Sequence, residues 1–142
     1  NKDYTDRDIE AAAAFVHADS FIESLPGGYH SKVIERGASY SSGERQLISF
    51  ARTILRDPKV LILDEATANI DTETELLIQE SMRKMREGRT TIAIAHRLST
   101  IRDAHLILVL DKGRVIERGT HEELIAKRGT YYDMYMLQSM ND

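Results

Sequence analysis

Val60-Leu61-Ile62-Leu63-Asp64-Glu65-Ala66-Thr67 is the stretch that decides the fold class of this chain. Four consecutive apolar residues predict a buried strand of a parallel sheet, and two carboxylates follow at its carboxyl end. Open α/β sheets bind ligands at that end. Adjacent acids there suit a Mg²⁺–nucleotide site, in which Asp64 holds the metal's water shell and Glu65 polarises an attacking water. A core strand that runs into a solvated acidic turn is the competing interpretation.

Apolar strands alternate with amphipathic helices along the rest of the chain, which predicts an α/β fold with a mostly parallel sheet flanked by helices. Buried strands are expected over 60–63, 90–95 and 106–110, and a hairpin turn over 111–114 leads into a strand at 115–117. Capping boxes at 5–8, 72–75 and 120–123 predict helix starts, and further helices are expected over 20–25, 42–56 and 131–137. The buried stripe of the 42–56 helix is expected to comprise Leu47, Ile48, Ala51, Ile54 and Leu55.

The composition is that of an ordinary soluble globular protein, with 42% apolar and 30% charged residues among 142. A net charge of −4 without a sustained basic run gives no support for a nucleic-acid partner. The absence of cysteine excludes disulfides and thiolate metal sites. No apolar run approaches the ~20 residues that span a bilayer. Any link to a membrane is therefore expected to run through a partner or an upstream region.

A loop becomes a helix at Ser41-Ser42-Gly43-Glu44. The unpaired N–H groups and the positive end of the helix dipole favour an anion there. Ser41 adds a hydroxyl donor, and Gly43 allows backbone to approach a phosphate without a Cβ. A serine that only caps the helix is the alternative interpretation.

Five motifs, in this order and at these spacings, resemble those of ATP-binding-cassette (ABC) ATPases of the exporter type. They are the signature at 40–46, the Walker B strand at 60–65, the D-loop at 68–71, the H-loop at 95–100 and the tail at 117–124. The resemblance covers nearly the whole chain and implies a sheet of the P-loop NTPase type. It assigns 1–58 to part of the ABC helical subdomain and 59–142 to the C-terminal part of the ATPase core. No G-x-x-x-x-G-K-[ST] occurs in the sequence, so we expect an incomplete domain that is inactive by itself.

The resemblance implies ATP and Mg²⁺ as cofactors and gives four residues a role. Asp64 corresponds to the Walker B aspartate that holds Mg²⁺ through water, and Glu65 to the general base. His96 corresponds to the H-loop histidine that contacts the γ-phosphate. Asp71 closes the D-loop, which contacts the other subunit's site in this family, and a helix N-cap at Asp71 is compatible with that role.

The signature residues Ser41, Ser42, Gly43 and Glu44 are expected to bind the γ-phosphate held by a second subunit. The segment 40–44 departs from the family's Leu-Ser-Gly-Gly-Gln at three positions. Tyr40 replaces Leu, Ser42 replaces the first Gly and Glu44 replaces Gln. Ser42 adds a Cβ and Glu44 adds negative charge near a triphosphate. We therefore expect a weak γ-phosphate contact from this subunit and an asymmetric heterodimer.

The leading hypothesis is an ATPase domain that couples ATP binding and hydrolysis to export of a substrate, at the cytoplasmic face of the cell membrane. Its expected partners are a second nucleotide-binding domain from a different subunit and the coupling helices of a transmembrane domain. The segment 31–37 resembles the part that touches those helices. The alternatives are a soluble ABC-type ATPase and a non-catalytic interaction fragment.

Overall fold

The computed structural model describes residues 3–33, 40–64, 70–95 and 98–140. The chain forms two compact units, Asn1–Ile92 and Ala93–Asp142. None of the helices in the described ranges is long and apolar enough to cross a lipid bilayer.

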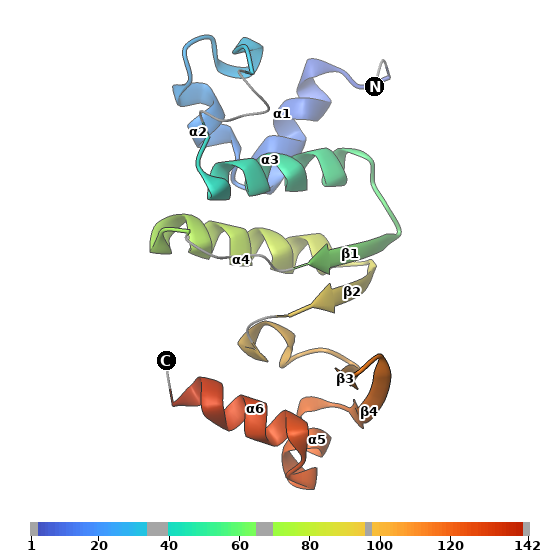
Figure 1. Ribbon diagram of the computed structural model, residues 1–142. Coiled ribbons are helices and arrows are strands. Elements are labelled where there is room, and N and C mark those ends of the chain that lie inside the picture. Colours follow the sequence, from blue (N-terminus) through green and yellow to red (C-terminus); the bar gives the residue numbers. More distant parts are fainter. Residues whose placement is uncertain (1–2, 34–39, 65–69, 96–97, 141–142) are drawn as a thin grey trace. The chain divides into compact units, whose positions relative to one another are not determined.

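Within its described residues, the first unit contains four α-helices, the strand β1 and the first three residues of its paired strand β2, which ends at Ile94. They are α1 (Asp6–Phe15), α2 (Asp19–Ser24), α3 (Ser42–Leu55), β1 (Val60–Asp64), α4 (Thr72–Arg86) and β2 (Thr90–Ile94), with a short 3-10 turn at Gly28–His30. The strands β1 and β2 are parallel neighbours joined through α4, as the alternating pattern predicts. Figure 1 shows α3 lying alongside α4, with α1 and α2 on the other side of α3.

One core joins these helices to β1. Ala13, Val16, Leu47, Phe50, Leu61, Leu63, Ile78, Met82 and Met85 are among its buried members. The stripe expected on α3 is confirmed in part, because Leu47 is buried in the core and the half-buried Ala51 and Ile54 pack against it, whereas Ile48 and Leu55 are only half-buried. Gly43 and Phe50 are buried instead. The buried line 43-47-50 therefore runs beside part of the expected stripe.

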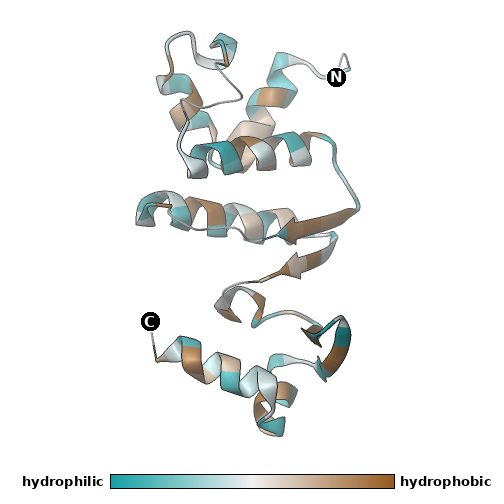
Figure 2. Ribbon diagram, viewed as in Figure 1, coloured by the Kyte–Doolittle hydropathy of each residue, from teal (hydrophilic) through white to brown (hydrophobic). Residues whose placement is uncertain are grey.

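Within the described residues, the prediction of buried strands is wrong for one face of β1 and for the whole of β2, in which no residue is buried. Leu61 and Leu63 pack into the core, whereas Ile62 is 71% exposed. Ile92 and Ile94 of β2 are exposed as well. Figure 2 shows the brown colour of hydrophobic residues over β1, and the open face carries the apolar side chains of Val60 and Ile62 before the strand ends at Asp64. The described helices supply apolar side chains to only one face of β1, and the second face has the composition of a buried surface.

The second unit contains a hairpin and two helices, preceded by a 3-10 turn at Leu98–Ile101. Strands β3 (Ile107–Asp111) and β4 (Arg114–Gly119) pair antiparallel with a bulge between Val109 and Leu110. Lys112 and Gly113 both have positive φ, as a two-residue type I′ turn requires. Ile107 and Val109 are buried, but Leu108 and Leu110 are exposed, so the expectation of a fully buried strand fails here in the same way.

Helices α5 (His121–Lys127) and α6 (Thr130–Ser139) cover the inner face of this hairpin around Leu124 and Tyr131. The Glu117 carboxylate accepts hydrogen bonds from the backbone N–H groups of Thr130 (2.8 Å) and Tyr131 (2.9 Å), which caps α6. His121 Nδ1 lies 2.9 Å from the Tyr131 hydroxyl in the core. This buried histidine is therefore part of a polar contact between the two helices.

Local capping signals are confirmed at α1 and α5. Thr5 and Asp8 form a reciprocal capping box, and so do Thr120 and Glu123. The capping box expected at 72–75 is wrong, because Asp71 is the N-cap of α4 and accepts from the backbone N–H of Thr74. A carboxylate one position upstream competes for the same N–H groups and satisfies them better than the Thr72 hydroxyl.

Candidate functional site

The signature segment forms the start of α3. The backbone N–H of Glu44 donates to Ser41 Oγ (3.1 Å), and the backbone N–H of Ser41 donates to Glu44 Oε2 (2.7 Å). Ser41 is therefore a helix N-cap in a reciprocal capping box, as the alternative interpretation held. Its side chain is exposed, and a serine hydroxyl that accepts a hydrogen bond still carries a proton that it can donate. Capping and phosphate binding are thus compatible at Ser41.

Tyr40, which replaces the family's leucine, anchors this segment to α2. Its ring meets Phe21 edge-on, with ring centroids 6.3 Å apart. Its carbonyl oxygen accepts a hydrogen bond from the Arg45 side chain. Tyr40 and Arg45, which flank the Ser41–Glu44 turn, are therefore joined to each other, and Tyr40 is packed against α2.

Gly43 lies in the first turn of α3 and is buried against the start of α4. A Cβ on Gly43 would lie less than 3.0 Å from Thr74 Cγ2, closer than real Cβ atoms come to a neighbour. It would also lie 3.3 Å from Ile70 Cγ2. Sequence reasoning found the glycine but missed this contact, since no local pattern links residues 31 positions apart.

Asp71 begins α4 beside that contact. The Thr74 backbone N–H donates to Asp71 Oδ1 (2.9 Å), and the Thr74 hydroxyl bonds the same carboxylate. Both bonds, the backbone bond first, hold the pKa of Asp71 below its ordinary value. The structure thus brings together two of the sequence-predicted segments, the signature at Gly43 and the D-loop residue Asp71, with Thr74 between them.

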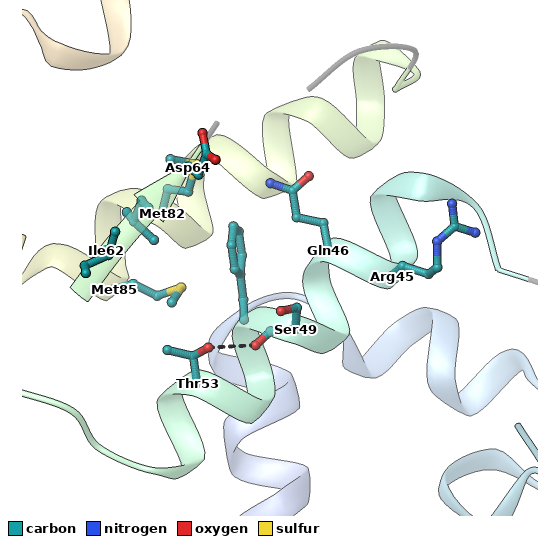
Figure 3. A pocket seen from close by; sticks show the side chains of 10 residues that line it. Arg45, Gln46, Ser49, Thr53, Ile62, Asp64, Met82 and Met85 are labelled. Carbon is teal, nitrogen blue, oxygen red and sulfur yellow. Dashed lines mark hydrogen bonds between the residues drawn. The ribbon is translucent and has the colours of Figure 1, made fainter. Parts of the chain in front are cut away.

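Asp64 is the last residue of β1 and lies at the edge of a pocket of about 440 Å³. Figure 3 shows that Gln46 projects from α3 on the side of Asp64, whereas Arg45 is directed away. The apolar side chains of Met82 and Met85 also line the pocket, on the side of Asp64 in Figure 3. The side chain of Asp64 is exposed, and no ion pair engages it among the residues that the structure describes.

The described residues supply only part of the ligands that a magnesium–nucleotide site needs. A carboxylate oxygen at a strand end suits Mg²⁺, which is commonly held by one or two carboxylates together with phosphates and water. Across the described ranges, no three His, Asp or Glu side chains gather closely enough to hold a metal ion. Glu65, His96 and the stretch from Ile34 to Gly37 lie outside the described residues.

Known proteins match the chain along almost all of its length. Residues 3–68 match the family model described as ABC transporter. The chain is 68% identical over 135 residues to the Streptococcus pneumoniae protein exp8, named as an ABC transporter ATP-binding protein, a match that covers 95% of this chain and 23% of that protein. It is 49% identical over 138 residues to an ATP-dependent lipid A-core flippase of Syntrophus aciditrophicus, covering 97% of this chain and 23% of the flippase.

A solved bacterial Atm1-family ABC exporter with ATP bound is similar in structure as well. The TM-score is 0.85 at 44% sequence identity, and the match covers 97% of this chain and 24% of the exporter chain. The chain spans about a quarter of the length of each of these three relatives. On this evidence the chain belongs to the ABC transporter family, as part of an ATP-binding domain of the exporter type.

Proposed function

We propose that this chain works as part of the ATP-hydrolysing domain of an ABC exporter and couples ATP binding and hydrolysis to the export of a substrate across a membrane. The observation that carries this proposal is the arrangement of the first unit. An exposed carboxylate ends β1 at Asp64, and two capped helix starts, at Ser41 and Asp71, meet through Gly43 and Thr74. These are the three segments that the family resemblance assigns to nucleotide chemistry.

Each side chain has a defined task in this proposal. Asp64 holds the water shell of Mg²⁺, for which its exposed carboxylate is suited. Glu65 takes the proton of the attacking water, and His96 donates to the γ-phosphate. When bound, ATP would supply the phosphoryl group and Mg²⁺ would offset the negative charge on its phosphates.

The altered signature supports an asymmetric pairing. In the capping box the Glu44 carboxylate lies 2.7 Å from the backbone nitrogen of Ser41, at the positive end of α3. A phosphate approaching that helix start meets a negative charge already bound to it. We infer that this subunit contributes a strong base, Glu65, but a weak γ-phosphate contact, and that a different subunit supplies the stronger signature.

Two partners follow from this proposal. A second ATP-binding domain shares both nucleotide sites, and a transmembrane domain provides the export route. The chain then works at the cytoplasmic face of the cell membrane, and it reaches the membrane only through that transmembrane domain.

A pair of variants in the assembled transporter tests the proposal. Glu65→Gln should lower the rate of ATP hydrolysis by about 10²–10⁴-fold, which is the usual contribution of a general base. Ser41→Ala should lower it by less than about tenfold, because the signature of this subunit serves the slower site. Glu10→Gln, a change of the same type on the exposed side of α1, should have no effect.

Full hydrolysis by the Glu65→Gln transporter would overturn the catalytic role. Equal, near-complete losses from Glu65→Gln and Ser41→Ala would overturn the asymmetric pairing and leave the catalytic role standing.

A further inference from the structure

The contact between Gly43 and Thr74 fixes two helix starts against each other. Gly43 belongs to the first turn of α3, Thr74 to the first turn of α4, and Figure 1 shows the two helices side by side. A Cβ on residue 43 would also lie 3.3 Å from both Thr74 Cβ and Ile70 Cγ2. The direction that a side chain would take at residue 43 is therefore occupied by α4. The missing Cβ makes room for Thr74, whatever else approaches this backbone.

Thr74 has little freedom to move out of the way. Its hydroxyl and its backbone N–H both bond the Asp71 carboxylate. A β-branched side chain also has few χ1 positions open to it in a helix. Turning the Cγ2 methyl away from α3 would therefore break the bond between the Thr74 hydroxyl and Asp71.

We propose that Thr74 is a positioning residue, which holds the signature segment of α3 in register with Asp71 by placing its methyl group against Gly43 and its hydroxyl on Asp71. This proposal rests on the proposed function for its effect on hydrolysis. A shift of either helix start moves the other, since one threonine side chain touches both. The residues that face the nucleotide from the signature and those that face the second subunit from the D-loop then move together.

A double-mutant cycle tests the contact. Gly43→Ala should speed amide exchange at Glu44 and Thr74 in the full-length protein by about fivefold or more, because an added methylene in a filled space forces the two starts apart. Without that contact the sign would be the opposite, since alanine is a better helix former than glycine. Thr74→Ser removes only the methyl group and should change exchange by less than about twofold. In the Gly43→Ala/Thr74→Ser protein, exchange should return to within about threefold of that in Thr74→Ser.

Thr74→Val is the matched control, because valine keeps both branches of the side chain and loses the hydroxyl. It should not rescue Gly43→Ala, and alone it should speed exchange at Thr74. ATP hydrolysis in the transporter should follow the same order. Gly43→Ala should lower it measurably but by less than about tenfold, because the signature of this subunit serves the slower site, and Thr74→Ser should restore it whereas Thr74→Val should not.

Failure of Thr74→Ser to rescue amide exchange would overturn the proposal, and so would rescue by Thr74→Val. Rescue of exchange with hydrolysis unchanged in all four proteins would also overturn the positioning role. A parent transporter that hydrolyses no ATP would count against the proposed function, whereas the exchange measurements would still decide whether Thr74 fixes the two helix starts.

Discussion

Ser81 is a buried polar residue whose removal should loosen α1 from α4. It is 0% exposed, and its hydroxyl oxygen lies 2.9 Å from the carbonyl oxygen of Val16 and 2.7 Å from that of Leu77. Leu77 is four residues upstream in the same helix, where the backbone N–H of Ser81 is the regular partner. Val16 is the C-cap of α1, and carbonyls at a helix end lack such a partner. Ser81→Ala therefore removes a donor that the Val16 carbonyl needs.

The size of the effect follows from two opposing contributions. A buried acceptor left without its donor costs about 1–3 kcal/mol. Alanine returns about 0.5 kcal/mol, because it is a better helix former than serine. We expect a net loss of about 0.5–2.5 kcal/mol, which corresponds to a roughly 2–70-fold change in the local opening equilibrium.

Amide hydrogen exchange over α1 and α4 measures this change directly. Ser139→Ala is the matched control, because the Ser139 hydroxyl donates only to the carbonyl of Tyr135 in its own helix (2.9 Å) and the residue is exposed. That variant should be neutral or slightly protective in α6. Unchanged exchange in α1 and α4 of Ser81→Ala would refute the reasoning that the Ser81 hydroxyl joins the two helices.

Three further outcomes are expected of the 142-residue chain. It should neither bind ATP tightly nor hydrolyse it, since it carries no P-loop sequence, and isothermal titration and phosphate release check this; tight binding would contradict it. It should self-associate, because Ile62 and Leu110 lie on exposed apolar strand faces; sedimentation that shows only monomer at high concentration would count against that. Its free energy of unfolding should decrease as the pH is lowered below about 4.5. Hydrogen bonds from Thr5 and Thr74 lower the pKa values of Asp8 and Asp71 in the folded chain. The stability that a lowered pKa provides is complete above the pKa of the unfolded chain and is lost on acidification. Denaturant titrations at two pH values measure the change, and equal stability at both would refute it.

Short-range signals predicted the helix starts well. The capping boxes of Thr5 and Thr120 depend on residues three positions apart, so both partners lie within one short segment of the sequence. At α4 two adjacent residues could cap the helix, and pattern alone did not choose Asp71 over Thr72. Which of the two neighbouring side chains accepts the backbone N–H hydrogen bond is decided by the backbone geometry at the helix start.

Contacts between segments far apart in the chain could not be predicted from the sequence. The reason for a glycine at 43 became visible only when α4 was placed beside α3, because Thr74 is far along the chain. The open face of β1 is a second feature that could not be predicted from local sequence. A run of four apolar residues predicts burial on both faces. Whether other side chains cover Ile62 depends on elements outside the strand, which the pattern within the strand does not describe.

We propose that Asp64 belongs to an ATP-hydrolysing site, and Asp111 offers a close comparison within the same chain. Asp64 ends the apolar strand β1, and Asp111 ends the apolar strand β3 with a similarly exposed carboxylate. Steady-state ATP hydrolysis by the full-length transporter should fall by about 100-fold or more in Asp64→Asn, because the water shell of Mg²⁺ loses its charged partner. Asp111→Asn should stay within about twofold of the parent, since asparagine is equally suited to a turn. Equal rates in the two variants, or full activity in Asp64→Asn, would contradict the claim.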